Sequence, residues 1–189
     1  FIREAHRKVG APGSTFCIVL FGEASAFPHG VKHAQVLKDG DMVLIDTGCL
    51  LHGYQSDITR SYVFGNPSER QRALWNLEKT AQQAAFDAAR LGQACEAVDA
   101  AARLSLEAAG LGPDYQLPGL PHRTGHGIGL DVHEPPLLDI KGPALLVGEA
   151  LTVEPGLYRR DLGGVRIEDM VIVTENGCEN LNTLHDDLC

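Results

Sequence analysis

The first third of the chain alternates between short apolar runs and polar turns, a pattern that is typical of β-strands. The run "STFCIVLFG" at residues 14–22 is apolar and ends at a glycine, which predicts a buried strand. After a loop over residues 23–40, apolar residues lead into "VLIDTGCLLHGYQSDITR" at residues 43–60, and an alternating stretch continues to Phe64. Because glycines bracket its middle, this segment predicts a strand, a tight turn and a second, antiparallel strand.

Two amphipathic helices are predicted next. At "NPSE", residues 66–69, an Asn cap, a Pro at the first helical position and a Glu two places later predict a helix start. The first helix keeps its apolar spacing to Gly92, and the second presents one apolar stripe before it stops at Gly110. The two stripes consist of Leu74, Leu77, Ala81, Ala84, Ala88 and Leu91, and of Val98, Ala101, Ala102, Ser105 and Ala109.

The last third of the chain returns to strands after an irregular connection. Residues 111–126 are rich in glycine and proline and predict a loop. Two segments with strand character follow, "EALTVEPGLY" at 149–158 and "GGVRIEDMVIVTENG" at 163–177, separated by a turn at "RRDLGG". This order of strands, two helices and further strands predicts an α+β fold with a largely antiparallel sheet.

Length and charge narrow the functions that such a fold can serve. With 189 residues the chain fits one domain of ordinary size, and a net charge of -9 argues against nucleic acid or an anionic membrane as the main partner. No apolar run is long enough to span a bilayer, and the opening "FIREAHRKVG" carries charges where a signal peptide needs an apolar core. These features predict a soluble, cytoplasmic protein.

The cysteines show no spacing that is typical of a metal site or a redox pair. Their number is odd, they are scattered along the chain, and no C-x-x-C motif is present. We therefore expect reduced thiols at Cys17, Cys49, Cys95, Cys178 and Cys189.

Two aspartates, Asp46 and Asp57, stand at either end of the predicted hairpin. If the turn is centred between Leu51 and His52, the carboxylates face each other across the strands, with Cβ atoms about 5 Å apart. Like charges in this position are destabilising, and burying an unpaired carboxylate costs more still. A cation between the two would remove both penalties, whereas a one-residue register slip would send them to opposite faces. Two solvated aspartates at a hairpin mouth are the simpler alternative.

Two glutamates and a histidine extend this acidic set. Glu154 interrupts "ALTVEP", and Glu168 lies inside "VRIEDMVIV", where the period of two places it on the same face as Arg166. Each residue alone has an ordinary explanation as a surface acid or a core histidine. Together, four carboxylates and one imidazole suit Mn²⁺ or Co²⁺ ahead of Zn²⁺, and they disfavour Cu²⁺. A set of this size predicts two ions about 3.5–4 Å apart. The five candidate ligands are Asp46, Asp57, His126, Glu154 and Glu168.

These residues, in this order, resemble the catalytic domain of the pita-bread metallopeptidases, a family that includes methionine aminopeptidase, Xaa-Pro aminopeptidase, prolidase and creatinase. The resemblance rests on two aspartates separated by ten residues, and on "GHGIG", "VEPG" and "VRIED", all between residues 22 and 177. It implies a pita-bread fold, a largely antiparallel curved sheet flanked by helices, and a metallopeptidase catalytic domain over residues 1–189.

The resemblance also implies how the ligands are shared between two divalent ions. Asp46 would chelate one ion, and His126 with Glu154 would chelate the other. Asp57 and Glu168 would bridge the pair.

Further residues are implicated on the substrate side by the same resemblance. They are His29 in "PHG", His122 in "HRTGHG" and His133 in "DVHEPP". Glu154 would shuttle a proton, and His133 would stabilise the oxyanion of the tetrahedral intermediate. His122 and Arg166 would hold the proline side of the substrate. Arg166 has two open roles, because it would either read a free carboxylate or merely neutralise the acids around it.

The segments around the motifs favour the proline-specific members of the family. "YQSDITRSY", "HRTGHGIGLDVHE" and "GGVRIEDMV" resemble those members more than methionine aminopeptidases, which do not usually carry an arginine two residues before the last glutamate. We therefore expect a proline-containing peptide as substrate. A dipeptide is favoured if Arg166 reads the carboxylate, and longer Xaa-Pro peptides are equally good if it does not. We also expect a homodimer.

The chain departs from the family pattern at its start. The family fold opens with a long helix, and proline-specific members usually carry a separate N-terminal domain. Here "FIREAHRKVGAPGST" keeps at most the tail of that helix. The sequence therefore predicts an incomplete first helix and a catalytic part whose remaining partner is an N-terminal piece of the same chain.

Three other functions stay open on the same fold. Methionine aminopeptidase is the nearest enzymatic alternative. A catalytically silent peptide-binding module and a metal-independent creatine amidinohydrolase are further alternatives. The five retained candidate ligands count against the last two.

Overall fold

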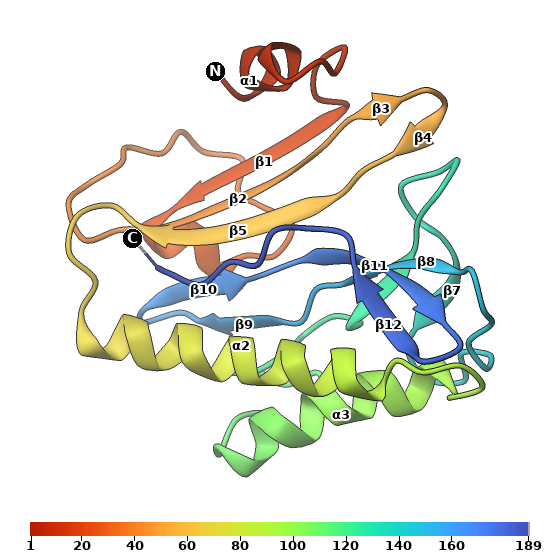
Figure 1. Cartoon of the computed structure of the whole chain (residues 1–189). Coiled ribbons are helices and arrows are strands. Elements are labelled where there is room, and N and C mark those ends of the chain that lie inside the picture. The colour runs from red at the N-terminus through yellow and green to blue at the C-terminus, as the bar shows by residue number, and fades with distance from the viewer. Residues whose placement is uncertain (189) are drawn as a thin grey trace.

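The N-terminal part of the chain forms a three-stranded antiparallel sheet in the computed structural model, which describes residues 1–188 (Figure 1). The strand order is β1–β2–β5, so the predicted hairpin supplies its centre and one edge. The strand predicted at residues 14–22 is β1, but it lies at the edge of the sheet and only Leu20 in it is buried, so the prediction of a buried strand is wrong. The predicted helix tail is the short α1. The bounds are α1 Ile2–Lys8, β1 Phe16–Phe21, the 3₁₀ helix η1 Gly22–Ala26, β2 Met42–Gly48 and β5 Ile58–Val63.

The register of the hairpin differs from the prediction by two residues. A small extension, β3 Leu50–Leu51 with β4 Tyr54–Gln55, closes through His52 and Gly53, whose φ angles are 52° and 88°. Two successive positive φ values are typical of a type I′ turn, which matches the twist of a hairpin. Asp46 therefore pairs with Thr59 and not with Asp57. Because the shift is an even number, both aspartates still belong to the same face.

Two helices follow, α2 Glu69–Ala88 and α3 Cys95–Ala108, as predicted. The cap of α2 is Ser68 and not Asn66. The Ser68 hydroxyl accepts a hydrogen bond from the backbone N–H of Gln71, and the Gln71 side chain accepts one from the backbone N–H of Ser68, at 3.3 and 2.8 Å. This capping box satisfies two N–H groups at once, which an Asn cap two residues earlier would not.

The C-terminal half forms a second antiparallel sheet with the order β12–β11–β8–β6–β7, and a separate ribbon of β9 and β10. The two predicted long strands are each broken. The strand predicted at residues 149–158 is interrupted at Pro155, because proline has no N–H to donate to a neighbouring strand. The strand predicted at residues 163–177 breaks at Glu168, whose backbone N–H donates to Thr59 O of the first sheet at 3.1 Å. The bounds are β6 Gly125–Gly127, β7 Glu134–Leu138, β8 Ala150–Val153, β9 Gly156–Arg159, β10 Gly163–Arg166, β11 Asp169–Thr174 and β12 Gly177–Asn180.

The two helices lie against the outer side of the second sheet and the ribbon, away from the first sheet (Figure 1). The main apolar core fills this interface and is built from both helices and the strands that they cover. Burial of such a continuous apolar surface fixes the helices and leaves the opposite side of the strands free for polar groups. The predicted α+β class, with antiparallel strand pairing throughout the described residues, is confirmed.

Within residues 1–188, no helix is long and apolar enough to cross a membrane. Cys17, Cys49, Cys95 and Cys178 are free thiols, as predicted. The prediction for Cys189 lies outside the described residues.

Candidate metal centre

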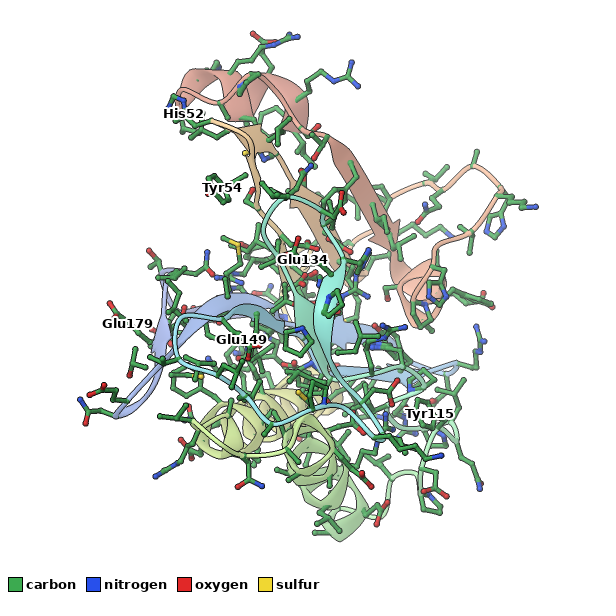
Figure 2. The ribbon with its side chains drawn as sticks, turned by 90° about the vertical axis from the view of Figure 1, so that its right-hand side faces the viewer. His52, Tyr54, Tyr115, Glu134, Glu149 and Glu179 are labelled. Atoms are coloured by element: carbon green, nitrogen blue, oxygen red, sulfur yellow. The ribbon has the colours of Figure 1, made fainter. Side chains whose placement is uncertain are left out.

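A cavity of about 760 Å³ opens where the two sheets meet. Strands β1 and β2, the loop before β6 and the segments around β6, β8 and β10 all contribute to its wall. Figure 2 shows that the loop bearing Tyr115 and the hairpin bearing His52 and Tyr54 lie at opposite ends of this side of the molecule. The lining residues are Phe16, Ile18, Pro28, His29, Asp46, Asp57, Tyr115, His122, Arg123, His126, Val132, His133, Asp139, Glu154 and Arg166.

The structure brings the five candidate ligands together at the base of this cavity. Two groups of candidate ligands, each with ligand atoms within 4.8 Å of one another, consist of Asp46, Asp57 and Glu168, and of His126, Glu154 and Glu168. A third group of this kind joins Asp57 and His126 to His133. Glu168 belongs to the first two groups and lies beneath the cavity wall, where it is 1% exposed. It reaches this place because the break between β10 and β11 pairs it with Thr59 of the first sheet. Glu168 thus lies with both predicted sets of ligands, and the predicted sharing of the five residues between two ions stays a prediction.

Three carboxylate oxygens in this cluster have no hydrogen-bond partner among the described residues. They are Oδ1 of Asp46, Oδ1 of Asp57 and Oε1 of Glu168, and all three are buried. Buried polar atoms are normally paired, and a group left unpaired carries the full cost of its desolvation. One oxygen from each of three neighbouring carboxylates therefore fits a cation and fits no protein donor.

His126 presents an unprotonated nitrogen to the same space. Burial lowers its pKa to about 4, so the ring is neutral near pH 7. Its Nδ1 lies 3.0 Å from Gly127 O and must carry the proton, which leaves a lone pair on Nε2. That nitrogen faces Glu154 Oε1 at 3.4 Å and Asp57 Oδ2 at 3.8 Å. Lone pairs that face each other repel, and an imidazole oriented by a backbone carbonyl in this way is typical of metal ligands.

Burial, and then repulsion between the acids, raises the pKa values of three of the carboxyl groups, those of Asp57, Glu154 and Glu168. Burial first, then Glu168 and Asp46, raise the pKa of Asp57 to about 10. Burial and Asp46 raise the pKa of Glu168 to about 7, and burial with Glu168 raises that of Glu154 well above its usual range. The protein alone thus disfavours four ionised carboxylates here, whereas divalent cations would favour them.

Arg166 is held by protein acceptors on three sides. Its Nη2 donates to Asp46, its Nη1 to the Tyr158 hydroxyl at 2.8 Å, and its Nε to Thr59 Oγ1 at 3.2 Å. The side chain is 4% exposed. Of the two roles predicted for Arg166, this geometry favours the neutralising one, and a direct contact with substrate stays a prediction.

The three substrate-side histidines all line the cavity. Burial, then Arg166, lower the pKa of His122 to about 3, and its Nδ1 donates to Arg123 O at 2.8 Å. Its Nε2 therefore accepts from the Tyr158 hydroxyl at 3.0 Å. His133 is exposed, with its ring centroid 4.2 Å from that of His126. His29 is exposed and lies near enough to His122 for its charge to act on that ring.

Sequence reasoning missed several residues that shape the site. Thr59 donates to Glu168 Oε2 at 2.7 Å, and its place two residues after Asp57 in an alternating strand could have indicated the shared face. Tyr158 carries no comparable pattern. On α3, Asp99 and Arg103 are spaced i, i+4 inside an apolar stripe, which could have indicated a buried ion pair.

The Asp99–Arg103 pair fastens the loop that carries His122. Arg103 donates to the carbonyls of Asp114, Leu120 and His122 at 2.8, 2.7 and 2.7 Å. Asp99 Oδ1 accepts from both the backbone N–H and the hydroxyl of Thr124, at 3.0 and 2.7 Å. The cavity wall between residues 114 and 124 is therefore anchored on α3.

We predict that Arg103→Met lowers the free energy of unfolding by about 3–5 kcal/mol, because it leaves the buried Asp99 charge and three carbonyls without a partner. Urea unfolding of the complete protein measures this loss. The matched control is Arg70→Met, whose ion pair with Asp161 has side chains 64% and 54% exposed. Breaking that pair should cost less than about 1 kcal/mol. Equal losses in the two variants would contradict the anchoring role.

Comparison with known proteins places the chain among peptidases. The family model described as metallopeptidase family M24 matches residues 1–175. An Xaa-Pro dipeptidase of Pyrococcus furiosus is 42% identical over 165 residues, which cover 87% of this chain and 46% of that protein. The crystal structure of dipeptidase PepE from Mycobacterium ulcerans superposes with a TM-score of 0.90 at 41% identity, over 98% of this chain and 49% of that one.

A structure described as an X-Pro aminopeptidase, from Thermotoga maritima, is also similar. It superposes with a TM-score of 0.89 at 37% identity, over 97% of this chain and 51% of that one. This chain thus spans about half the length of the relatives that it matches.

Proposed function

This chain belongs to metallopeptidase family M24, and we propose that it is the catalytic part of an exopeptidase that hydrolyses the bond between an N-terminal residue and proline. The observation that carries the proposal is the buried cluster of four carboxylates and one neutral imidazole at the base of the cavity. The carboxylates of a surface acid cluster would be solvated, whereas three carboxylate oxygens of this cluster are buried without a hydrogen-bond partner among the described residues.

The ligands that we propose for two divalent ions are Asp46, Asp57, His126, Glu154 and Glu168. Asp57 and Glu168 are the proposed bridging ligands, since each lies near members of both groups. When bound, such ions supply a water nucleophile at neutral pH and polarise the scissile carbonyl. Because oxygen donors dominate, Mn²⁺ or Co²⁺ is the favoured metal and Zn²⁺ a further candidate.

The remaining roles fall to side chains that face the cavity. Glu154 would take and return a proton, because its carboxylate lines the cavity next to the proposed metal ligand His126. His133 is exposed to the cavity and would donate a hydrogen bond to the oxygen that becomes negative in the transition state. His29 and His122 also line the cavity and would bind the substrate, His122 on its proline side.

The substrate that we favour is an Xaa-Pro dipeptide. Apolar side chains on the cavity wall suit a proline ring, and they include Phe16, Ile18, Pro28 and Val132. The relatives include an Xaa-Pro dipeptidase and an X-Pro aminopeptidase, so cleavage of longer Xaa-Pro peptides is the second candidate. A homodimer, a cytoplasmic location and cooperation with an N-terminal part of the same chain stay predictions.

A peptide panel tests the substrate class. The complete protein, loaded with Mn²⁺, should hydrolyse Ala-Pro faster than Ala-Pro-Ala, and both faster than Met-Ala. Release of free alanine or methionine, measured by chromatography, gives kcat/KM for each peptide. Faster cleavage of Met-Ala would instead assign a methionine aminopeptidase, and no cleavage of any of the three would reject the proposed function.

A further inference from the structure

A second guanidinium, that of Arg123, lies on the cavity wall next to His122. The residue is half-buried, and its positive charge acts on both His126 and Glu154. Its backbone carbonyl accepts from His122, but within residues 1–188 its side chain has no hydrogen-bond or ion-pair partner. A half-buried guanidinium, with five N–H donors in a fixed fork, is thus presented to the cavity unpaired.

The backbone on both sides of Arg123 is fixed in place. Arg103 holds the preceding carbonyl, that of His122, at 2.7 Å. Asp99 holds the following residue, Thr124, by its N–H and its hydroxyl. Because α3 anchors both neighbours, the ordering of this backbone is complete before a ligand binds, and that reduces the cost of binding.

Arg123 and Arg166 differ in whether their guanidinium N–H groups are available to a ligand. Arg166 already donates to Asp46, Tyr158 and Thr59 and is 4% exposed. In the proposed site, two divalent ions would balance the four carboxylates, so Arg123 is not needed to neutralise them. Its charge is therefore available to an anionic group of the substrate.

One acid shares this part of the wall and must be accounted for. Asp139 also lines the cavity, but its Oδ1 accepts from the Tyr115 hydroxyl and from the N–H of Ile140. Tyr115 is in turn covered by the Arg103 guanidinium, 4.0 Å from its ring centroid. Asp139 is thus engaged with its own loop and forms no ion pair with Arg123.

We propose that Arg123 binds the free carboxylate of the dipeptide substrate and so determines the preference for dipeptides. This inference rests on the proposed Xaa-Pro activity. Arginine binds a carboxylate through two parallel hydrogen bonds, which makes the contact sensitive to the position of the charge. A third residue or an amide at the C-terminus removes the carboxylate from this position.

The test compares Ala-Pro with Ala-Pro amide, which differ only in the charge that Arg123 is proposed to read. In the wild type, kcat/KM should be about tenfold to a hundredfold higher for Ala-Pro, as expected for one charge-assisted hydrogen-bonded contact. In Arg123→Gln this ratio should fall to nearly one, mainly through a higher KM for Ala-Pro. Arg123→Lys keeps a point charge without the fork and should give an intermediate ratio.

Controls separate this role from others. Arg90→Gln removes the same charge at an exposed site just after the C-terminal end of α2 and should leave the ratio unchanged. A wild-type ratio near one, or a high ratio that survives in Arg123→Gln and Arg123→Lys, would overturn the inference while leaving Xaa-Pro hydrolysis intact. If the ratio falls to one in Arg166→Lys and in neither variant of Arg123, Arg166 is the residue that binds the carboxylate, and the inference is wrong. A wild type that cleaves neither peptide rejects the proposed function and this inference with it.

Discussion

Asp57→Asn is expected to lower kcat/KM for Ala-Pro on the order of a thousandfold or more, the scale seen when a group that acts in the transition state is lost. Asp57 is 5% exposed and lies within ligand distance of both the Asp46–Glu168 group and His126. An amide has one oxygen and no charge, so it can neither bridge two cations nor offset their charge. Steady-state kinetics at saturating Mn²⁺ measure the loss.

The fold of this variant should survive, because the raised pKa of Asp57 means that its carboxyl must take up a proton to be buried in the metal-free state, and an amide is buried without that cost. In the metal-free state, the melting temperature of Asp57→Asn should equal or exceed that of the wild type. Asp87→Asn, the same replacement at an exposed position of α2, is the matched control and should change neither activity nor melting temperature. Near wild-type activity in Asp57→Asn would show that the two-metal assignment is wrong.

Metal removal should abolish the activity altogether. After dialysis against a chelator, the complete protein should hydrolyse no Ala-Pro above background, and Mn²⁺ or Co²⁺ should restore the rate. The cluster offers carboxylate oxygens together with the Nε2 lone pair of His126. Ca²⁺, which binds oxygen ligands almost exclusively, should restore little activity and is the control for added charge.

The melting temperature measures metal binding without depending on catalysis. Ions that bind the folded chain and not the unfolded one raise the melting temperature. Mn²⁺ should therefore stabilise the wild type and stabilise Asp57→Asn less, while Asp87→Asn should match the wild type. Undiminished hydrolysis in a sample from which divalent ions have been removed would contradict the metal assignment.

The sequence predicted the site better than it predicted the details of the strands. Glu154 and Glu168 were recognisable because each interrupts an apolar run, and a carboxylate in such a place needs a partner. The hairpin argument placed Asp46 opposite Asp57, but the I′ turn at His52 and Gly53 shifts the register by two residues. Since side chains alternate with a period of two, a shift of two residues leaves Asp46 and Asp57 on the same face of the sheet, as predicted.

Other features depend on contacts that no local pattern contains. The break before Glu168 forms because its N–H pairs with Thr59, which lies far away in the chain. The role of Arg166 likewise depends on Asp46 and Tyr158, which reach it from other strands. The free guanidinium of Arg123 is visible only once the partners of its neighbours, Asp99 and Arg103, are known.

The stoichiometry of bound metal tests the central claim most directly. Elemental analysis of the complete protein, equilibrated with saturating Mn²⁺ and freed of excess ion, should find two ions per chain. Asp57→Asn should retain fewer ions, because it lacks a bridging carboxylate, and Asp87→Asn should retain both. A wild-type protein that holds no divalent ion, or an Asp57→Asn variant that holds two as tightly as the wild type, would contradict a dinuclear centre built from these residues.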